Sequence, residues 1–146
     1  KKYLAVLSGI LEKDSSTISA PIARKNNSII EREIREDGDL AISHFKVLER
    51  FNNMTLVEYT LETGRTHQLR VHSKYIGHPI VGDSLYGSEN SLISRQALHA
   101  YEVSFVHPIN KEKMLIHSNL PDDIKKLVNA NKTWLFALII ILEINV

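Results

Sequence analysis

The feature that most constrains the fold is the opening segment, KKYLAVLSG. In an extended chain its apolar side chains fall on both faces, with Tyr3, Ala5 and Leu7 on one face and Leu4 and Val6 on the other. A strand that is apolar on both faces is typical of the buried centre of a sheet. Because a domain rarely begins on its central strand, we expect the chain to be the C-terminal part of a longer protein.

Further segments predict that strands dominate the fold, with helices between and after them. TLVEYTLET alternates apolar and polar residues as a half-buried strand does, and the preceding SHFKVLER joins it through FNNM. ALHAYEVSFVHP and KMLIHS predict a second hairpin, which turns at INKE. Between these, residues 12–28 are rich in turn formers and predict a long surface loop, and residues 29–42 predict an exposed hairpin that turns at Gly38.

Two helices are expected. Thr66 is a suitable N-cap and Gly77 a suitable stop, which predicts a helix over residues 66–76. PDDIKKLVNA begins with proline and two carboxylates, as the first turn of a second helix does. The spacing of the first helix gives it a packing side and a basic side, formed respectively by Leu69, His72 and Ile76 and by His67, Arg70 and Lys74.

The start of this first helix is unusually basic. Arg65, His67 and Arg70 lie where the helix dipole already places positive charge, at a cost of about 0.3 to 1 kcal/mol per charge unless an anion is present. One interpretation is an exposed face of solvated arginines. The other is an anion site, which Gly64 favours because it lets a ligand or backbone approach closely.

Composition excludes several function classes. Eighteen Lys and Arg against seventeen Asp and Glu give a net charge of +1, so any surface that binds nucleic acid must be a local basic patch. With no cysteine and no histidine pair at i, i+4 on the helix, we expect no metal site, and no Walker, dinucleotide-binding or Gly-x-Ser-x-Gly pattern occurs. The apolar run over residues 134–142 is too short for a membrane span of roughly 20 residues. No signal sequence opens the chain, and we expect a cytoplasmic protein.

The residues at this point resemble a known family. TGRTHQLRVHSKYIGHPIVGDSLYG is similar to the signature of the RluA family of RNA pseudouridine synthases, and KKYLAVLSG resembles that family's tyrosine motif. ISAPIARK, DGDLAISHFKVLER and ALHAYEVSFVHP extend the resemblance over residues 1–121. It implies an α+β fold around a mostly antiparallel or mixed sheet with flanking helices. It also implies isomerisation of uridine to pseudouridine within ribosomal or transfer RNA, with neither a metal nor a cofactor.

The resemblance assigns roles to single residues. Tyr3 matches the tyrosine that stacks on the flipped uracil, Arg70 the arginine that pairs with the nucleophilic aspartate, and Leu69 the apolar residue beside it. RNA phosphates are expected to meet the basic residues Arg24, Lys25, Arg65, His67 and Lys74. We interpret Asp83 as a turn residue rather than a catalytic one.

The departure from the family concerns the nucleophile. The family's His-Arg-Leu-Asp motif precedes the tyrosine strand and occurs nowhere in this sequence, so we expect this chain alone to be inactive. Residues 1–130 are expected to form the C-terminal part of the catalytic domain, and residues 131–146 an apolar tail of unknown role. The alternatives are a non-catalytic RNA-binding module derived from the same fold and a truncated product without independent function.

Overall fold

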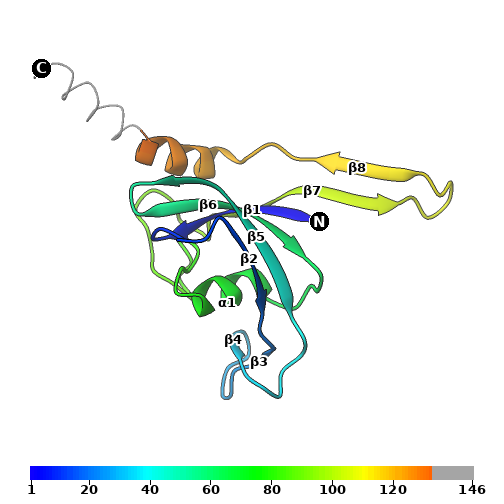
Figure 1. The fold of residues 1–146 in the computed structure, drawn as a ribbon, viewed down its shortest axis with the longest axis horizontal. Helices are drawn as coiled ribbons and strands as arrows, with labels where there is room; N and C mark the ends of the chain where they lie inside the picture. Colours follow the sequence, from blue (N-terminus) through cyan, green and yellow to red (C-terminus); the bar gives the residue numbers. More distant parts are fainter. Residues whose placement is uncertain (133–146) are drawn as a thin grey trace, which may run out of the picture.

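A computed structural model describes residues 1–132 of the chain. Its main sheet has six strands in the order β2-β5-β6-β1-β7-β8, and each pair of neighbouring strands in it is antiparallel (Figure 1). A small second sheet pairs β3 with β4. The strand bounds are β1 Lys2–Ser8, β2 Ser15–Ser19, β3 Ile22–Arg24, β4 Arg32–Ile34, β5 Ile42–Phe51, β6 Met54–Leu61, β7 Leu98–Val106 and β8 Lys113–His117.

The opening segment is the central strand that its sequence predicts. β1 lies between β6 and β7, where Tyr3 is opposite Tyr59 on one side and Ala100 on the other. Ala5, Val6 and Leu7 of this strand are at most 1% exposed. The predicted α+β class, with a mostly antiparallel sheet, is confirmed.

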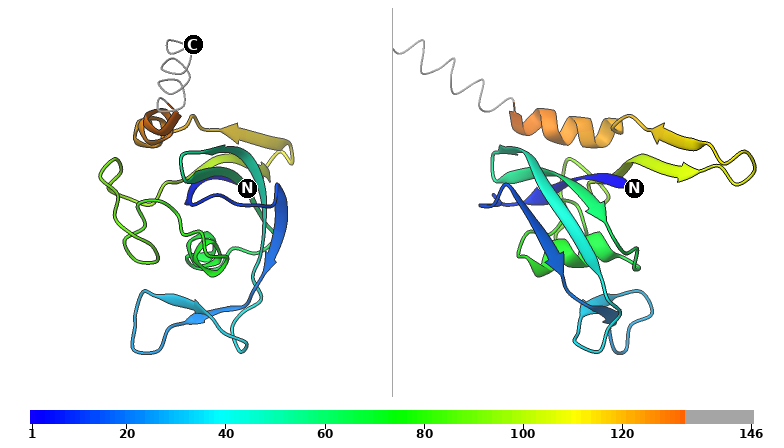
Figure 2. Two further views of the ribbon diagram at one scale, coloured as in Figure 1. Left: turned by 60° about the vertical axis from the view of Figure 1, so that its left-hand side comes forward. Right: turned by 45° about the vertical axis from the view of Figure 1, so that its right-hand side comes forward.

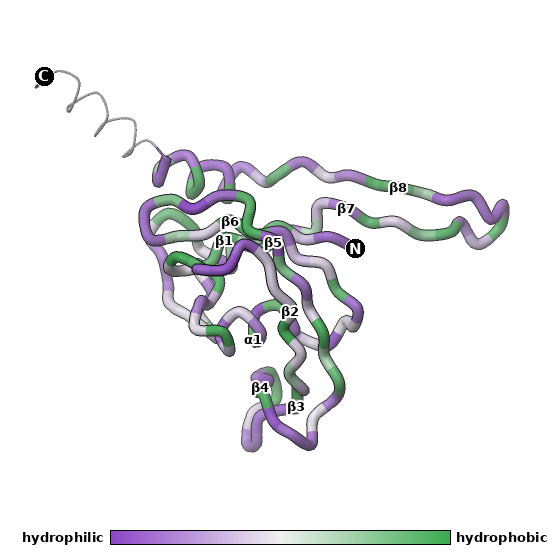
Figure 3. The backbone as a smooth tube through the Cα atoms, in the orientation of Figure 1, coloured by the Kyte–Doolittle hydropathy of each residue, from purple (hydrophilic) through white to green (hydrophobic). Residues whose placement is uncertain are grey.

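Both predicted hairpins of the main sheet are also confirmed. β5 and β6 pair through a turn in which Asn52 and Asn53 have positive φ, a conformation that asparagine tolerates better than most residues. β7 and β8 form the second hairpin, which extends away from the rest of the molecule (Figure 1). Hydrophobic stretches run along this hairpin (Figure 3), and Phe105, Val106 and Leu115 remain exposed on it.

Two predictions for residues 12–42 are wrong. The expected surface loop contains β2, which adds to the edge of β5 and buries Ile18, and β3, so long-range pairing overrides the local turn signals. The expected hairpin is formed instead by β3 and β4, and its turn lies before β4 rather than at Gly38. Gly38 is required for a different reason, because a Cβ there would lie 2.6 Å from the carbonyl carbon and oxygen of Ile22.

Two helical segments lie on opposite sides of the sheet (Figures 1 and 2). α1, Gln68–Tyr75, packs beneath the sheet, and residues 122–132 form a helix on the other side that buries Ile124 and Leu127. α1 ends before Gly77, as predicted, and buries Leu69 and His72 on its packing side.

The predicted N-cap of α1 is wrong. The cap residue is His67 rather than Thr66, it lies in the left-handed region with φ 57° and ψ 19°, and no side chain caps the helix. The hydroxyl of Tyr86 holds His67 by a hydrogen bond, and Thr66 is exposed. The helix start is therefore fixed by a tertiary contact, which the local sequence does not reveal.

The predicted apolar tail, from residue 133 onward, lies outside the described residues, and the division of the chain at residue 130 stays a prediction. Across residues 1–132, no helix combines the length and the apolar character that crossing a membrane requires.

Candidate functional site

The structure brings together the three residues to which the resemblance assigns catalytic roles. Tyr3 from β1 and Leu69 and Arg70 from α1 line one cavity of about 380 Å³, here called the site cavity. Gly64, Arg65, His67 and Gln68 from the start of α1 also line it, together with Leu61, Gln96 and Leu98. The strand and the helix start are adjacent because α1 packs beneath the central strands. The catalytic roles themselves remain predictions.

Arg70 forms a two-point ion pair with Asp83. Its Nε and Nη2 atoms each donate to a different carboxylate oxygen at 2.8 Å, and the Asp83 side chain is completely buried. Burial alone would raise the pKa of Asp83, but hydrogen bonds from Arg70 and from the Tyr86 backbone outweigh it and hold the pKa below its ordinary value. The hydrogen bonds between Arg70 and Asp83 raise the pKa of Arg70. Arg70 is therefore a fixed cation at the wall of the site cavity.

Asp83 is a turn residue, as predicted, and it also positions Tyr86. Its Oδ1 accepts the backbone N–H groups of Leu85 and Tyr86 at 3.1 Å each. The Tyr86 ring lies under the Arg70 guanidinium, 5.0 Å from its central carbon, and packs edge-on against His67. One carboxylate thus orients both the arginine and the aromatic ring beside it.

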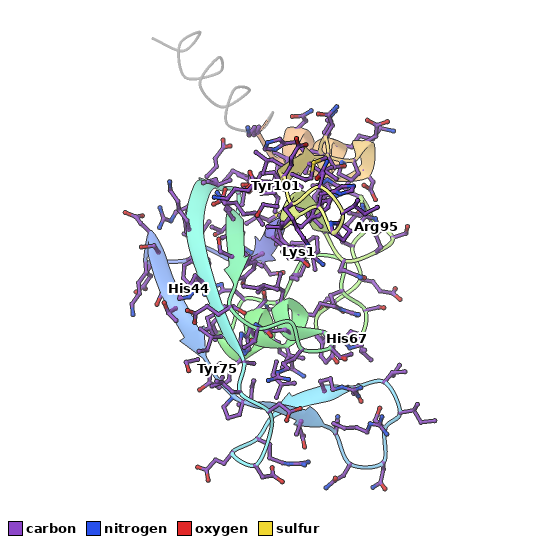
Figure 4. The ribbon with its side chains drawn as sticks, turned by 90° about the vertical axis from the view of Figure 1, so that its right-hand side faces the viewer. Lys1, His44, His67, Tyr75, Arg95 and Tyr101 are labelled. Carbon is purple, nitrogen blue, oxygen red and sulfur yellow. The ribbon has the colours of Figure 1, made fainter. Side chains whose placement is uncertain are left out.

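The Tyr86 hydroxyl links the helix start to the small sheet. It accepts the backbone N–H of Arg32 at 2.8 Å and lies 2.7 Å from Nδ1 of His67. Burial lowers the pKa of His67, and the charges of Arg70 and Arg32 lower it further. This lowered pKa favours the neutral ring, which can still donate one hydrogen bond to a phosphate. Figure 4 shows His67 at the start of α1 and Tyr75 at its other end.

A buried glutamine holds the loop before the helix. The Gln68 Oε1 accepts the Thr63 hydroxyl at 2.8 Å and the Arg65 N–H at 2.9 Å. Its Nε2 donates to the Ile42 carbonyl and to the Ser43 hydroxyl. The amide thereby uses its whole hydrogen-bonding capacity to fix the backbone around Gly64 at the mouth of the site cavity.

A buried histidine joins α1 to the sheet. His72 Nε2 lies 2.9 Å from the Ala20 carbonyl, which can only accept, so this nitrogen carries the proton. Nδ1 then accepts the Ser43 hydroxyl at 2.8 Å. Burial lowers the pKa of His72 more than the bond to Ala20 raises it, so the ring is neutral. His72 is a structural residue that fixes the position of the helix carrying Arg70.

The predicted RNA-binding residues do not all line one hollow, although Arg24 and Lys25 share a hollow and Arg32 lines both that of Lys74 and that of Arg65. Arg24 and Arg65 line a second hollow, which adjoins the site cavity through Gly64 and Arg65. Lys25 pairs with Glu31 at 3.4 Å, and with Lys74 it lines a different hollow, between β4 and the outer side of α1. The structure therefore brings Arg24 and Arg65 next to the candidate site and separates Lys74 from it.

Sequence reasoning missed Gln68 and Tyr86 and undervalued Asp83. All three lie inside the TGRTHQLRVHSKYIGHPIVGDSLYG block. The sequence feature that could have revealed them is the occurrence of these polar residues in the same block as the basic helix start. Their contacts depend on the fold of the loop after Gly77, which the periodicity of the sequence does not predict. Within residues 1–132, no group of three or more His, Asp or Glu side chains could hold a metal ion.

Comparison with known proteins identifies the class. A sequence model of the RNA pseudouridylate synthase family matches residues 1–75, slightly more than half of the chain. The chain belongs to this family, and within it to the RluA type, as the resemblance predicted.

Individual relatives agree with the family match. YjbO, an uncharacterised RNA pseudouridine synthase of Bacillus subtilis, is 48% identical over 130 residues, which are 89% of this chain and 46% of that protein. The ribosomal large subunit pseudouridine synthase D of Xanthomonas campestris is 38% identical over 144 residues, covering 89% of this chain and 43% of the relative. The chain spans slightly less than half the length of these relatives.

A solved structure shows the same fold. Human RNA pseudouridylate synthase domain containing 1 superimposes with a TM-score of 0.72 at 28% identity, covering 90% of this chain and 64% of the human chain. The similarity therefore extends beyond the residues that the family model matches.

Proposed function

We propose that this chain is the C-terminal part of an RNA pseudouridine synthase that converts uridine to pseudouridine in ribosomal or transfer RNA. The observation that carries the proposal is the site cavity, which places Tyr3, Leu69 and Arg70 side by side in a chain of this family. The similarity to an enzyme named for the large ribosomal subunit favours ribosomal RNA as the first substrate to test. We further propose a cytoplasmic location.

The proposed reaction begins when the target nucleotide leaves its stack, at a cost of a few kcal/mol, and enters the site cavity. An aspartate attacks the nucleoside, the bond between uracil N1 and the ribose breaks, and the uracil turns over. C5 then bonds to the ribose as the bond between the ribose and the aspartate breaks, which releases the carboxylate, and the proton on C5 is lost while N1 gains one. Tyr3 stacks on the uracil and helps to remove the C5 proton, and Leu69 packs beside it.

Arg70 is proposed to hold the attacking carboxylate in its ionised form. Its Nε and Nη2 atoms already bind Asp83, whereas Nη1 has no hydrogen-bond partner among the described residues. A second carboxylate can therefore approach the Nη1 side, and a nearby guanidinium lowers the pKa of such a group. Because no His-Arg-Leu-Asp motif occurs in residues 1–146, we propose that this second carboxylate belongs to the upstream part of the full-length protein.

The experiment is tritium release from RNA labelled at uridine C5. This chain is compared with a version extended upstream through a His-Arg-Leu-Asp motif, and the extended protein carrying Tyr3→Ala serves as the site variant. The extended protein should release tritium. The short chain should fall to background because nucleophilic catalysis requires the aspartate, and the Tyr3→Ala variant should fall to background because it lacks the ring proposed to stack on the uracil and to help remove the C5 proton.

Release by the short chain at the rate of the extended protein would show that the nucleophile lies within these 146 residues. If the extended protein binds RNA but never releases tritium, the function is that of a non-catalytic RNA-binding module instead.

A further inference from the structure

The arginines of this chain divide into two groups. Of seven arginines, four form ion pairs with carboxylates, namely Arg35, Arg50, Arg70 and Arg95. The other three have no carboxylate partner within the described residues, and all three line the same hollow. This hollow, here called the arginine hollow, measures about 380 Å³ and is lined by Arg24, Arg32, Arg65, Asp39, Ile22, Ala23, Gly64 and Thr66.

The arginine hollow adjoins the site cavity. Gly64 and Arg65 line both, so a ligand in one lies next to a ligand in the other. Gly64 has nothing within 4 Å of the position that a Cβ would occupy, so no atom crowds the backbone that the two hollows share. Its lining residues come mainly from β3, β4 and the loop before α1.

Two of the three arginines are held in place by their surroundings. Arg65 donates from Nε to the Leu40 carbonyl at 2.9 Å, which leaves the ends of its guanidinium free. Arg32 is half-buried, and its backbone N–H is bound by the Tyr86 hydroxyl, the same group that holds His67. These hydrogen bonds hold Arg65 and Arg32 in place, and the bond through Tyr86 ties the hollow to His67 of the site cavity.

We propose that the arginine hollow binds a backbone phosphate of the nucleotide next to the uridine in the site cavity, with Arg32 as its previously unassigned anchor. The inference rests on the proposed function. Guanidinium groups bind phosphate oxygens through two parallel hydrogen bonds, and three of them without carboxylate partners form a site for a diester anion. Asp39 opposes them with one negative charge, so the lining carries two net positive charges.

A phosphate site of this kind positions RNA without reading its sequence. Its effect should therefore be the same for any base that flanks the target uridine. This expectation separates it from a base-reading pocket, whose loss would change the preference among flanking bases.

The test uses the full-length protein and a labelled, single-stranded RNA of mixed sequence that contains uridine. Arg32→Gln should weaken binding by about tenfold or more at low salt, as expected for the loss of charge-assisted hydrogen bonds. The slope of log affinity against log salt should become shallower by about 0.7, the value for one phosphate on a single strand. Arg50→Gln is the matched control, because Arg50 is already paired with Asp14 at 2.8 Å, and it should leave both quantities unchanged.

A second variant should change RNA affinity in the opposite direction. Asp39→Asn removes the one carboxylate in the lining while keeping its shape, so it should tighten RNA binding by about twofold at low salt. A variant that was merely misfolded could not bind more tightly, so this result would not be explained by loss of structure.

The outcomes separate this inference from the proposed function. Unchanged affinity and salt slope in Arg32→Gln, or equal losses in Arg32→Gln and Arg50→Gln, would overturn the phosphate site while tritium release by the unmodified protein still supports the enzyme. A variant that changes the preference for flanking bases would also overturn it. If the unmodified protein releases no tritium and binds no RNA, the proposed function has failed instead.

Discussion

The pair formed by Arg70 and Asp83 allows a quantitative test of how burial sets the contribution of an ion pair to the free energy of unfolding. In Asp83→Asn, the amide keeps an oxygen for the backbone N–H groups of Leu85 and Tyr86 but loses the charge that faces Arg70. Breaking a buried pair costs about 3 to 5 kcal/mol, because the remaining charge is left without a partner. The Arg70 side chain is 16% exposed, so water relieves part of this cost and we expect a loss near the lower end, about 3 kcal/mol.

A matched control exists in the same chain. Arg95 and Asp123 pair with the same two-point geometry, at 2.8 and 2.9 Å, but their side chains are 40% and 39% exposed. Since solvent screens such a pair, Asp123→Asn should cost under about 1 kcal/mol. The assay is urea unfolding of the full-length protein and of the two variants, followed by circular dichroism at pH 7.

The pH dependence gives an independent check on the same pair. The pKa of Asp83 is lower in the folded state than in the unfolded state, so its contribution is complete above the unfolded value of about 4 and is lost as pH falls through the folded one. The difference in the free energy of unfolding between the unmodified protein and Asp83→Asn should therefore be constant from pH 7 to pH 5 and shrink below about pH 4. Equal losses in the Asp83 and Asp123 variants at pH 7 would refute the reasoning, because burial would then not decide the cost.

Two further predictions concern stability. Burial lowers the pKa of His72 in the folded state, so as pH drops the unfolded chain binds a proton at this histidine before the folded chain does, and stability should fall below about pH 6.5. His72→Gln replaces the ring with a neutral side chain and should flatten this decline in urea unfolding. The flattening should be larger than in His67→Gln. Gly82→Ala should destabilise the fold by roughly 2 to 4 kcal/mol in thermal unfolding, because Gly82 has φ +80° and a Cβ there would lie 2.2 Å from the Arg95 carbonyl oxygen. Gly77 also has positive φ, but a Cβ there would meet open space, so Gly77→Ala should cost less.

The central strand, both hairpins of the main sheet and α1 could be predicted from the sequence because each rests on a local pattern. In β1 that pattern is apolar residues on both faces, and in β6 it is strict alternation. β2 could not be predicted in this way, since its sequence SSTIS contains one apolar residue and its order comes from pairing with β5. Local propensity is weak at such an edge, and the partner strand decides the outcome.

The candidate site shows the same division between local and long-range information. Arg70 and Tyr3 were found through motifs, and the structure adds what those motifs do not contain: the carboxylate that neutralises Arg70 lies thirteen positions further along the chain, beyond the end of the helix. This changes the chemistry expected of the arginine. The negative charge of Asp83 offsets part of the positive field that a second carboxylate would feel from Arg70. The paired guanidinium therefore lowers the pKa of such a carboxylate less than an unpaired arginine would.

The consequence concerns the balance between ionisation and nucleophilicity. A carboxylate held by an unopposed cation would be ionised but weakly nucleophilic, because its electron pair would be strongly stabilised. Asp83 offsets the field of that cation while Tyr86 and the turn around Leu85 fix its direction, so one buried residue sets both the net charge around Arg70 and its geometry. The polar residues of the block are therefore interdependent: Asp83 fixes Tyr86, and Tyr86 fixes both His67 at the helix start and Arg32 on the hairpin. A substitution at Asp83 should consequently disturb the site cavity and the arginine hollow together.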